Sequence, residues 1–151
     1  MKKKVLICLF SALTILLAGC DFGSTKKFYL DDEFYGSWKM IEITAEKFSE
    51  LDNENYVLFT YNNFCAMAIP CEEIFDEFLE QNDVTFLSMR YDEFKKTTLH
   101  ETVKFAPSIV VVKNWKVIAY LDSEKDEDLV RYQDVEEFGK WINKYVYCKI
   151  Q

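Results

Sequence analysis

One stretch of the chain decides the fold: Val57-Leu58-Phe59-Thr60-Tyr61-Asn62-Asn63-Phe64-Cys65. Its first half is rich in aromatic and β-branched residues, which predicts a buried strand over 56–61. A short polar turn follows and ends on a cysteine. The next segment, 72–81, has the spacing of an amphipathic helix, with one apolar face formed by Ile74, Phe75, Phe78 and Leu79. The sequence therefore predicts a thiol in the turn between a buried strand and a helix.

A proline and a hairpin follow further along the chain. Pro107 is one of only two prolines, and it precedes the apolar runs 109–112 and 117–121. The four polar or aromatic residues between these runs predict a β-hairpin. Trp115 lies where such a turn favours glycine, so we expect a less regular turn than Asn-Gly would form.

The remaining periodicities complete the order of elements. We expect a helix after the cap Thr44 and a last helix after the cap Asp134. Further predicted segments are a strand at 39–43, helix 45–51, a strand at 84–89, helix 92–103, an acidic loop at 122–128 and helix 135–145. The predicted order is β-α-β-α-β-α-β-β-α, which is an α/β domain.

The N-terminus has the pattern of an export signal. Three lysines at positions 2–4 precede an uncharged apolar run over 5–17, too short for an ordinary membrane span. The run ends in Leu17-Ala18-Gly19-Cys20, which resembles the bacterial lipobox. That resemblance implies a signal peptide at 1–19, a lipidated Cys20 with a tether at 20–37, and a domain at 38–151. An uncleaved signal anchor or an ordinary secretory signal is the alternative.

Composition excludes several classes of function. Loss of the signal removes three lysines and no acidic residues, so the net charge falls from −8 to −11. Such a surface repels nucleic acid phosphates and anionic lipid headgroups, and we expect no nucleic acid partner. After residue 25 the only glycines are Gly36 and Gly139, so no glycine-rich loop can hold a nucleotide. The chain also has no Ser-His-Asp pattern or H-E-x-x-H run.

The element order, the cysteine turn and the proline before the hairpin together resemble the thioredoxin superfamily. The resemblance covers about residues 38–146, and the segments that carry it are 41–48, 58–65, 106–108 and 134–145. It implies a central mixed sheet flanked by helices. It also implies a cis peptide bond at Pro107 facing Cys65, with Ala106, Pro107 and Phe64 contacting a substrate chain.

The chain departs from this family at the thiol motif. The family pattern is C-x-x-C, whereas here Ala68 stands in place of the second cysteine and a thiol returns only at Cys71. The family's buried acid is replaced by Phe59, and the lysine that partners it by Ser88. Ordinary dithiol reduction is therefore one of several possibilities.

Three interpretations of the cysteine pair are open. On one continuous helix, residues six apart diverge around the axis. A helix that starts at Pro70 would instead let residues 66–69 bring Cys65 within the Cα reach of a disulfide to Cys71, about 7 Å. The bridge is then either reversible or permanent and structural. In the third interpretation Pro70 kinks the helix from inside, Cys71 is a buried small hydrophobe, and Cys65 acts alone or not at all.

Other candidate sites carry less weight. Cys148 follows the last helix, and we expect an idle, partly exposed thiol there, with pairing to another chain as the alternative. Met67 between the cysteines is compatible with a Cu(I) site, but the only histidine, His100, belongs to a different segment. The carboxylates of 122–128 lack the glycine and spacing of a calcium loop. We expect no metal and no cofactor.

The sequence therefore predicts a lipid-anchored, monomeric thiol–disulfide oxidoreductase outside the cytoplasm. It would lie on the outer face of the cytoplasmic membrane or in the periplasm and act on exported protein thiols or disulfides. Cys65 would attack and Cys71 would resolve the mixed disulfide. The alternative is a redox-inactive thioredoxin-like binding module of the cell envelope with a structural Cys65–Cys71 disulfide.

Overall fold

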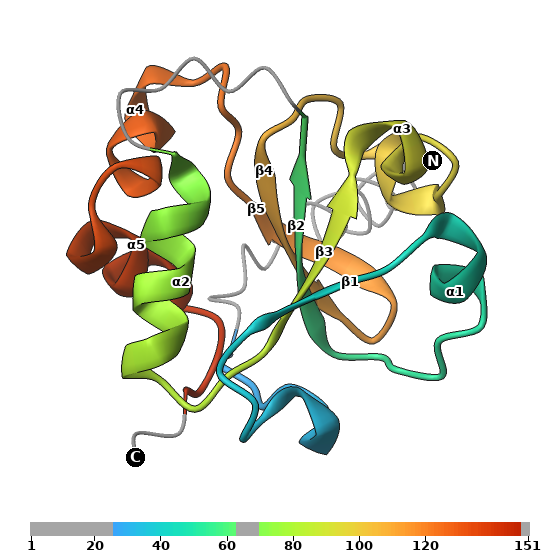
Figure 1. The fold of residues 1–151 in the computed structure, drawn as a ribbon, viewed down its shortest axis with the longest axis horizontal. Helices are drawn as coiled ribbons and strands as arrows, with labels where there is room; N and C mark the ends of the chain where they lie inside the picture. The colour runs from blue at the N-terminus through green and yellow to red at the C-terminus, as the bar shows by residue number, and fades with distance from the viewer. Residues whose placement is uncertain (1–25, 63–69, 149–151) are drawn as a thin grey trace, which may run out of the picture.

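A five-stranded mixed sheet forms the centre of the protein (Figure 1). The computed structural model describes residues 26–62 and 70–148. The strand order is β1-β3-β2-β4-β5. The strands β1, β3 and β2 run parallel to one another, and β4 runs antiparallel to both of its neighbours, β2 and β5. The strands are β1 (Met40–Glu42), β2 (Tyr56–Tyr61), β3 (Phe86–Arg90), β4 (Ser108–Lys113) and β5 (Lys116–Tyr120). The central strand β2 is almost wholly buried, as its apolar run predicts.

Helices cover both faces of this sheet (Figure 1). The helix α2 (Cys71–Gln81) packs beside α5 (Val135–Ile142) on one face. The short helices α1 (Ala45–Ser49) and α3 (Tyr91–Phe94) lie on the other side. The connections include α4 (Asp126–Leu129) and three 3-10 turns, η1 (Asp32–Phe34), η2 (Thr98–Glu101) and η3 (Val130–Tyr132). Within the described residues, no helix has the length and apolar character needed to cross a bilayer.

Two helix caps predicted from the sequence are confirmed. The Thr44 hydroxyl accepts a hydrogen bond from the Lys47 N–H at the start of α1, at 3.4 Å. The Asp134 carboxylate accepts one from the Glu137 N–H at the start of α5, at 2.9 Å. Each cap satisfies a backbone donor that has no partner within its helix, so each fixes where the helix begins.

One predicted helix is wrong. Residues 92–103 form α3 and η2 rather than a continuous helix. The Thr97 hydroxyl donates to the Phe94 carbonyl oxygen at 2.8 Å. A side chain thus provides a hydrogen bond to this carbonyl group at the end of α3. Leu99 and Val103 are buried, so this irregular segment is held by packing rather than by helical periodicity.

The segment before β1 is part of the packed domain. Phe28, Leu30 and Phe34, which the sequence analysis assigned to the tether, are buried in the core. Phe28 also forms a parallel bridge with Val146 near the C-terminus. A few apolar residues within a polar segment are a weak signal of burial in the sequence. Their burial depends on contacts with distant parts of the core.

The carboxylate of Asp31 joins this segment to the start of β2. It accepts hydrogen bonds from the backbone N–H groups of Glu54 (2.8 Å) and Asn55 (3.3 Å), and from the side-chain amides of Asn53 and Asn55. Burial alone would raise the pKa of Asp31, but these hydrogen bonds outweigh it and lower the pKa below its ordinary value of 3.8.

We expect Asp31→Asn to lower the free energy of unfolding at neutral pH by about 1–3 kcal/mol, because the ionised acceptor is lost. The lowered pKa means that this contribution is present above pH 3.8 and disappears as the pH falls through the folded-state pKa. Urea unfolding at pH 7 and near pH 3 measures the effect. The difference between wild type and variant should shrink at the lower pH, and Asp32→Asn, at an exposed neighbour, should change neither value.

Candidate functional site

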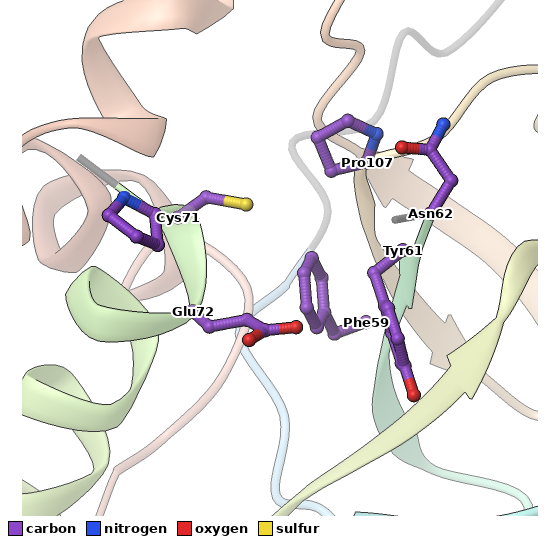
Figure 2. Close-up of a pocket in the computed structure, with 7 residues that line it drawn as sticks. Phe59, Tyr61, Asn62, Cys71, Glu72 and Pro107 are labelled. Carbon is purple, nitrogen blue, oxygen red and sulfur yellow. The ribbon is translucent and has the colours of Figure 1, made fainter. Parts of the chain in front are cut away.

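A cavity of about 530 Å³ lies between the N-terminus of α2 and the carboxyl end of β2. Figure 2 shows the Cys71 sulfur pointing into this cavity from the helix, with Pro107 and Phe59 on the opposite side. Tyr61, Asn62, Pro70 and Glu72 complete the lining. The structure thus brings Cys71 and Pro107, two of the predicted site residues, to one cavity.

The helix α2 begins at Cys71, with Pro70 as its N-cap. This start contradicts the interpretation in which Pro70 kinks the helix from inside. It agrees with the alternative in which the regular helix begins at the proline. The first turn of α2 and the positive end of its dipole therefore lie at Cys71. Cys71 is only 3% exposed.

The peptide bond between Ala106 and Pro107 is cis. The side-chain amide of Asn62, at the end of β2, donates to the Ala106 carbonyl oxygen at 3.2 Å. The Tyr132 hydroxyl lies 3.0 Å from the Pro107 carbonyl oxygen and 2.9 Å from that of Leu121, and it donates to them. Two side chains from distant parts of the chain therefore hold the proline loop beside the cavity.

Sequence reasoning missed both of these supporting residues. Asn62 and Ala106 are 44 residues apart, and Tyr132 and Pro107 are 25 apart. Neither contact follows from a local periodicity. The one available signal was the polar Asn62 directly after a buried strand, where side chains of a parallel sheet often reach a site.

Tyr132 is fully buried, and burial raises the pKa of its hydroxyl well above the ordinary value of 10.0, so it remains a donor. We expect Tyr132→Phe to lower the free energy of unfolding by about 1–3 kcal/mol, because two buried carbonyl oxygens lose their donor. Urea unfolding measures this loss. Tyr120→Phe, on β5 and only half-buried, serves as the control, and an equal loss there would contradict the assigned role of Tyr132.

The two departures from the family pattern lie side by side. Phe59 on β2 pairs in register with Ser88 on β3, and Phe59 is fully buried against the cavity. An aromatic ring thus fills the position where the family resemblance implies an acid. Among the described lining residues, the carboxylate at this cavity is Glu72, which Figure 2 shows extending toward the Phe59 ring.

Several predicted residues lie outside the described part of the chain. They are Cys20, Phe64, Cys65 and Met67. Among the residues that are described, no three His, Cys, Asp or Glu side chains gather as a metal site. Cys148 is a half-buried free thiol at the other end of the domain, and burial raises its pKa to about 11.

The structure is similar to solved thioredoxins. It matches thioredoxin NaTrxh from Nicotiana alata with a TM-score of 0.50 at 18% identity, covering 70% of this chain and 91% of that one. A Schistosoma mansoni thioredoxin matches with 0.48 at 19%, covering 72% and 96%. A variant thioredoxin from Halobacterium salinarum NRC-1 matches with 0.46 at 18%, covering 67% and 91%. No protein-family description matches the sequence, and neither does any curated protein.

The chain therefore has the thioredoxin fold, as the sequence predicts. Three features make up this fold in the present chain: the strand order, the cis proline just before β4, and the helix α2 that begins at a cysteine. At these identities the likeness concerns the fold, and the chemistry has to be argued from the site itself.

Proposed function

We propose that this protein exchanges thiols and disulfides with exported proteins, using Cys65 and Cys71 in turn. The observation that supports the proposal most is the Cys71 sulfur directed into a cavity opposite Pro107. A buried thiol at a helix N-terminus beside a peptide-sized opening is suited to exchange, because the helix end favours the thiolate, which is the reactive form.

The burial of Cys71 separates the roles of the two thiols. At 3% exposure, Cys71 offers an external disulfide too little surface for direct attack. Cys65, six residues earlier, is therefore assigned the first attack. Its thiolate attacks the substrate disulfide, forms a mixed disulfide and releases one substrate thiolate. Cys71 then attacks the Cys65 sulfur, releases the second substrate thiolate and leaves a Cys65–Cys71 disulfide, so the protein is oxidised and the substrate reduced by two electrons.

The reverse sequence oxidises a substrate dithiol and returns the protein to its reduced form. Continued turnover in either direction requires a second dithiol or disulfide from another protein. Ala106 and Pro107 would contact the substrate backbone at the cavity, together with Phe64.

The same proposal includes the cellular location. The pattern ending in Cys20 is that of a lipidated export signal, so the domain would be anchored on the outer face of the cytoplasmic membrane or in the periplasm. An oxidising envelope compartment is where a protein of this chemistry meets disulfide substrates.

A turnover assay tests the proposal. The chain, purified in detergent, is mixed with a disulfide-bonded peptide and dithiothreitol, and with the reduced peptide and oxidised glutathione. We expect a rate at least about 100-fold above the uncatalysed reaction in one of the two directions, and its loss in Cys65→Ser. Rates equal to the uncatalysed reaction in both directions would overturn the proposal.

A second candidate is supported by Phe59. Because an aromatic ring replaces the buried acid, proton transfer to and from the inner thiol has lost its family route. The fold would then serve as a binding module of the envelope, with a permanent Cys65–Cys71 disulfide that stabilises the turn. Binding of an envelope protein that survives replacement of both cysteines would favour this candidate.

A further inference from the structure

Exposed aromatic side chains gather at the end of the domain opposite the thiol site. Among the described residues, the strongly exposed aromatics are Tyr29, Trp38, Phe105, Trp115 and Tyr147. Only Phe105 adjoins the cis proline. The other four belong to segments at the amino ends of the parallel strands: the chain before β1, the β4–β5 turn and the C-terminal segment (Figure 1). We call these four residues the aromatic end.

Hydrogen bonds and ring contacts hold the aromatic end in place. The Trp38 indole N–H donates to the Asp83 carboxylate at 2.9 Å. The Trp115 backbone N–H donates to the Glu54 carbonyl oxygen at 3.2 Å. Tyr29 and Tyr147 stack with ring centroids 4.6 Å apart. The side chains of Tyr29, Trp38 and Tyr147 are thus held at the surface, and the turn that carries Trp115 is held by its backbone.

Both tryptophans occupy backbone conformations that favour glycine. Trp38 has a φ of 53° and Trp115 a φ of 62°, in the left-handed region. A side chain there costs about 1 kcal/mol or more relative to glycine. Both residues are nonetheless about half exposed, at 47% and 48%. Each therefore keeps a large aromatic surface in contact with solvent at a position where the backbone favours glycine.

The chemistry of this end matches a lipid headgroup layer. Tyrosine and tryptophan favour the boundary between water and hydrocarbon because one part of each ring system is apolar and another forms hydrogen bonds. Lys27 lies over the Tyr147 ring and Lys113 over the Phe28 ring. Further exposed lysines at this end are Lys26, Lys116 and Lys144, and acidic residues, among them Asp31, Asp32, Glu33, Glu54 and Asp83, lie among the lysines.

The distance to the proposed anchor is short. Only five residues separate Cys20 from Lys26, where the described chain begins at this same end. Five residues span at most about 20 Å when fully extended. A lipid on Cys20 would therefore keep the aromatic end within about 20 Å of the bilayer surface.

We propose that the aromatic end docks on the membrane surface and holds the thiol site facing away from it. This inference rests on the proposed lipid anchor. Tyr29, Trp38, Trp115 and Tyr147 enter the headgroup layer, while the cavity of Cys71 lies beyond the length of β2, about 17 Å further out. The protein then presents its site to partners in the envelope rather than to the lipid.

Tryptophan quenching tests this orientation. The lipidated full chain is reconstituted in vesicles of phosphatidylethanolamine and phosphatidylcholine, whose headgroups carry no net charge, with or without brominated acyl chains. We expect the brominated lipid to lower the emission of Trp38 and Trp115 about twofold, since both lie at the interface. Trp141 is buried and provides the unquenched background. Unchanged emission in a chain that still floats with the vesicles would overturn the docking.

A matched reporter at the other end completes the test. Phe105 is 48% exposed, as Trp115 is, but lies at the site. In a Trp38→Gly, Trp115→Gly background, Phe105→Trp should show no quenching by brominated lipid, and equal quenching would contradict the orientation. Glycine accepts the left-handed backbone at both positions, and circular dichroism of each variant verifies the fold before quenching is measured. A chain that does not float with the vesicles at all refutes the anchor instead, and that outcome is distinct from a failure of docking.

Discussion

Cys71→Ser is expected to lower the turnover of thiol–disulfide exchange at least about 100-fold, because a serine hydroxyl cannot release the mixed disulfide on Cys65. The sulfur of Cys71 points into the cavity from the first residue of α2, opposite Pro107. The serine oxygen occupies a similar space, but the serine hydroxyl stays protonated at neutral pH and provides no nucleophilic anion. The assay with the disulfide-bonded peptide measures the loss, and the mixed disulfide should accumulate as a covalent adduct visible by mass spectrometry.

Cys148→Ser is the matched control for this experiment. Cys148 lies at the opposite end of the domain, and burial raises the pKa of its thiol to about 11, so it is almost wholly protonated at neutral pH. Its replacement should leave turnover unchanged. If Cys71→Ser retains the wild-type rate, or if Cys148→Ser loses as much activity, the assignment of the site is wrong.

Phe75→Ala is expected to have the largest effect on stability, about 3–5 kcal/mol of the free energy of unfolding. Phe75 is fully buried one turn after Cys71. Its ring centroid lies 4.7 Å from that of Phe138, 5.1 Å from Phe59 and 5.9 Å from Tyr132. Truncation leaves a cavity among rings that also support the site. Since domains are stable by only about 5–15 kcal/mol, much of the total would be lost.

Urea unfolding measures this loss, with Phe105→Ala as the control of equal chemistry. Phe105 is about half exposed, so its truncation should cost less than about 1 kcal/mol. Equal losses at the two positions would show that the packing between α2, α5 and the sheet does not determine stability. A small loss at Phe75 would contradict its place in the core.

The parts of the fold that the sequence predicts well have strong local patterns. Strand β2 and helix α2 match their predicted ranges to within one residue, because a fully apolar strand and a four-residue apolar stripe allow few alternatives. The caps Thr44 and Asp134 are equally local, since the side chain bonds a backbone N–H three residues on. Asn114 and Trp115 do form the predicted hairpin turn with positive φ, without glycine.

The parts that local reasoning predicts poorly depend on contacts between distant residues. The segment 92–103 carries enough apolar residues for a helix, yet Thr97 ends α3 and the core buries Leu99 and Val103 individually. Phe28 is buried in the core beside its bridge partner Val146, which lies more than a hundred residues later in the chain. Such packing overrides local propensity and leaves no periodic signal.

The candidate site likewise has residues that the sequence singles out and residues that only the folded chain brings together. Pro107 and Cys71 are single residues with distinctive chemistry, and both line one cavity. The family resemblance suggests the cis proline, whereas Cys71 is singled out from its spacing after Pro70. The start of α2 at Cys71 decides against a proline kink, which the sequence alone left open. Asn62 and Tyr132 support the proline loop through hydrogen bonds that only the folded chain brings together.

Equilibration in glutathione buffers tests the central claim most directly. The purified chain is held at a series of ratios of reduced to oxidised glutathione, and its free thiols are then counted by alkylation and mass spectrometry. Exchange predicts that the thiols of Cys65 and Cys71 are lost and regained together, reversibly, with a midpoint between about −120 and −300 mV. Two thiols that never form a bridge, or a bridge that survives millimolar reductant, would contradict it.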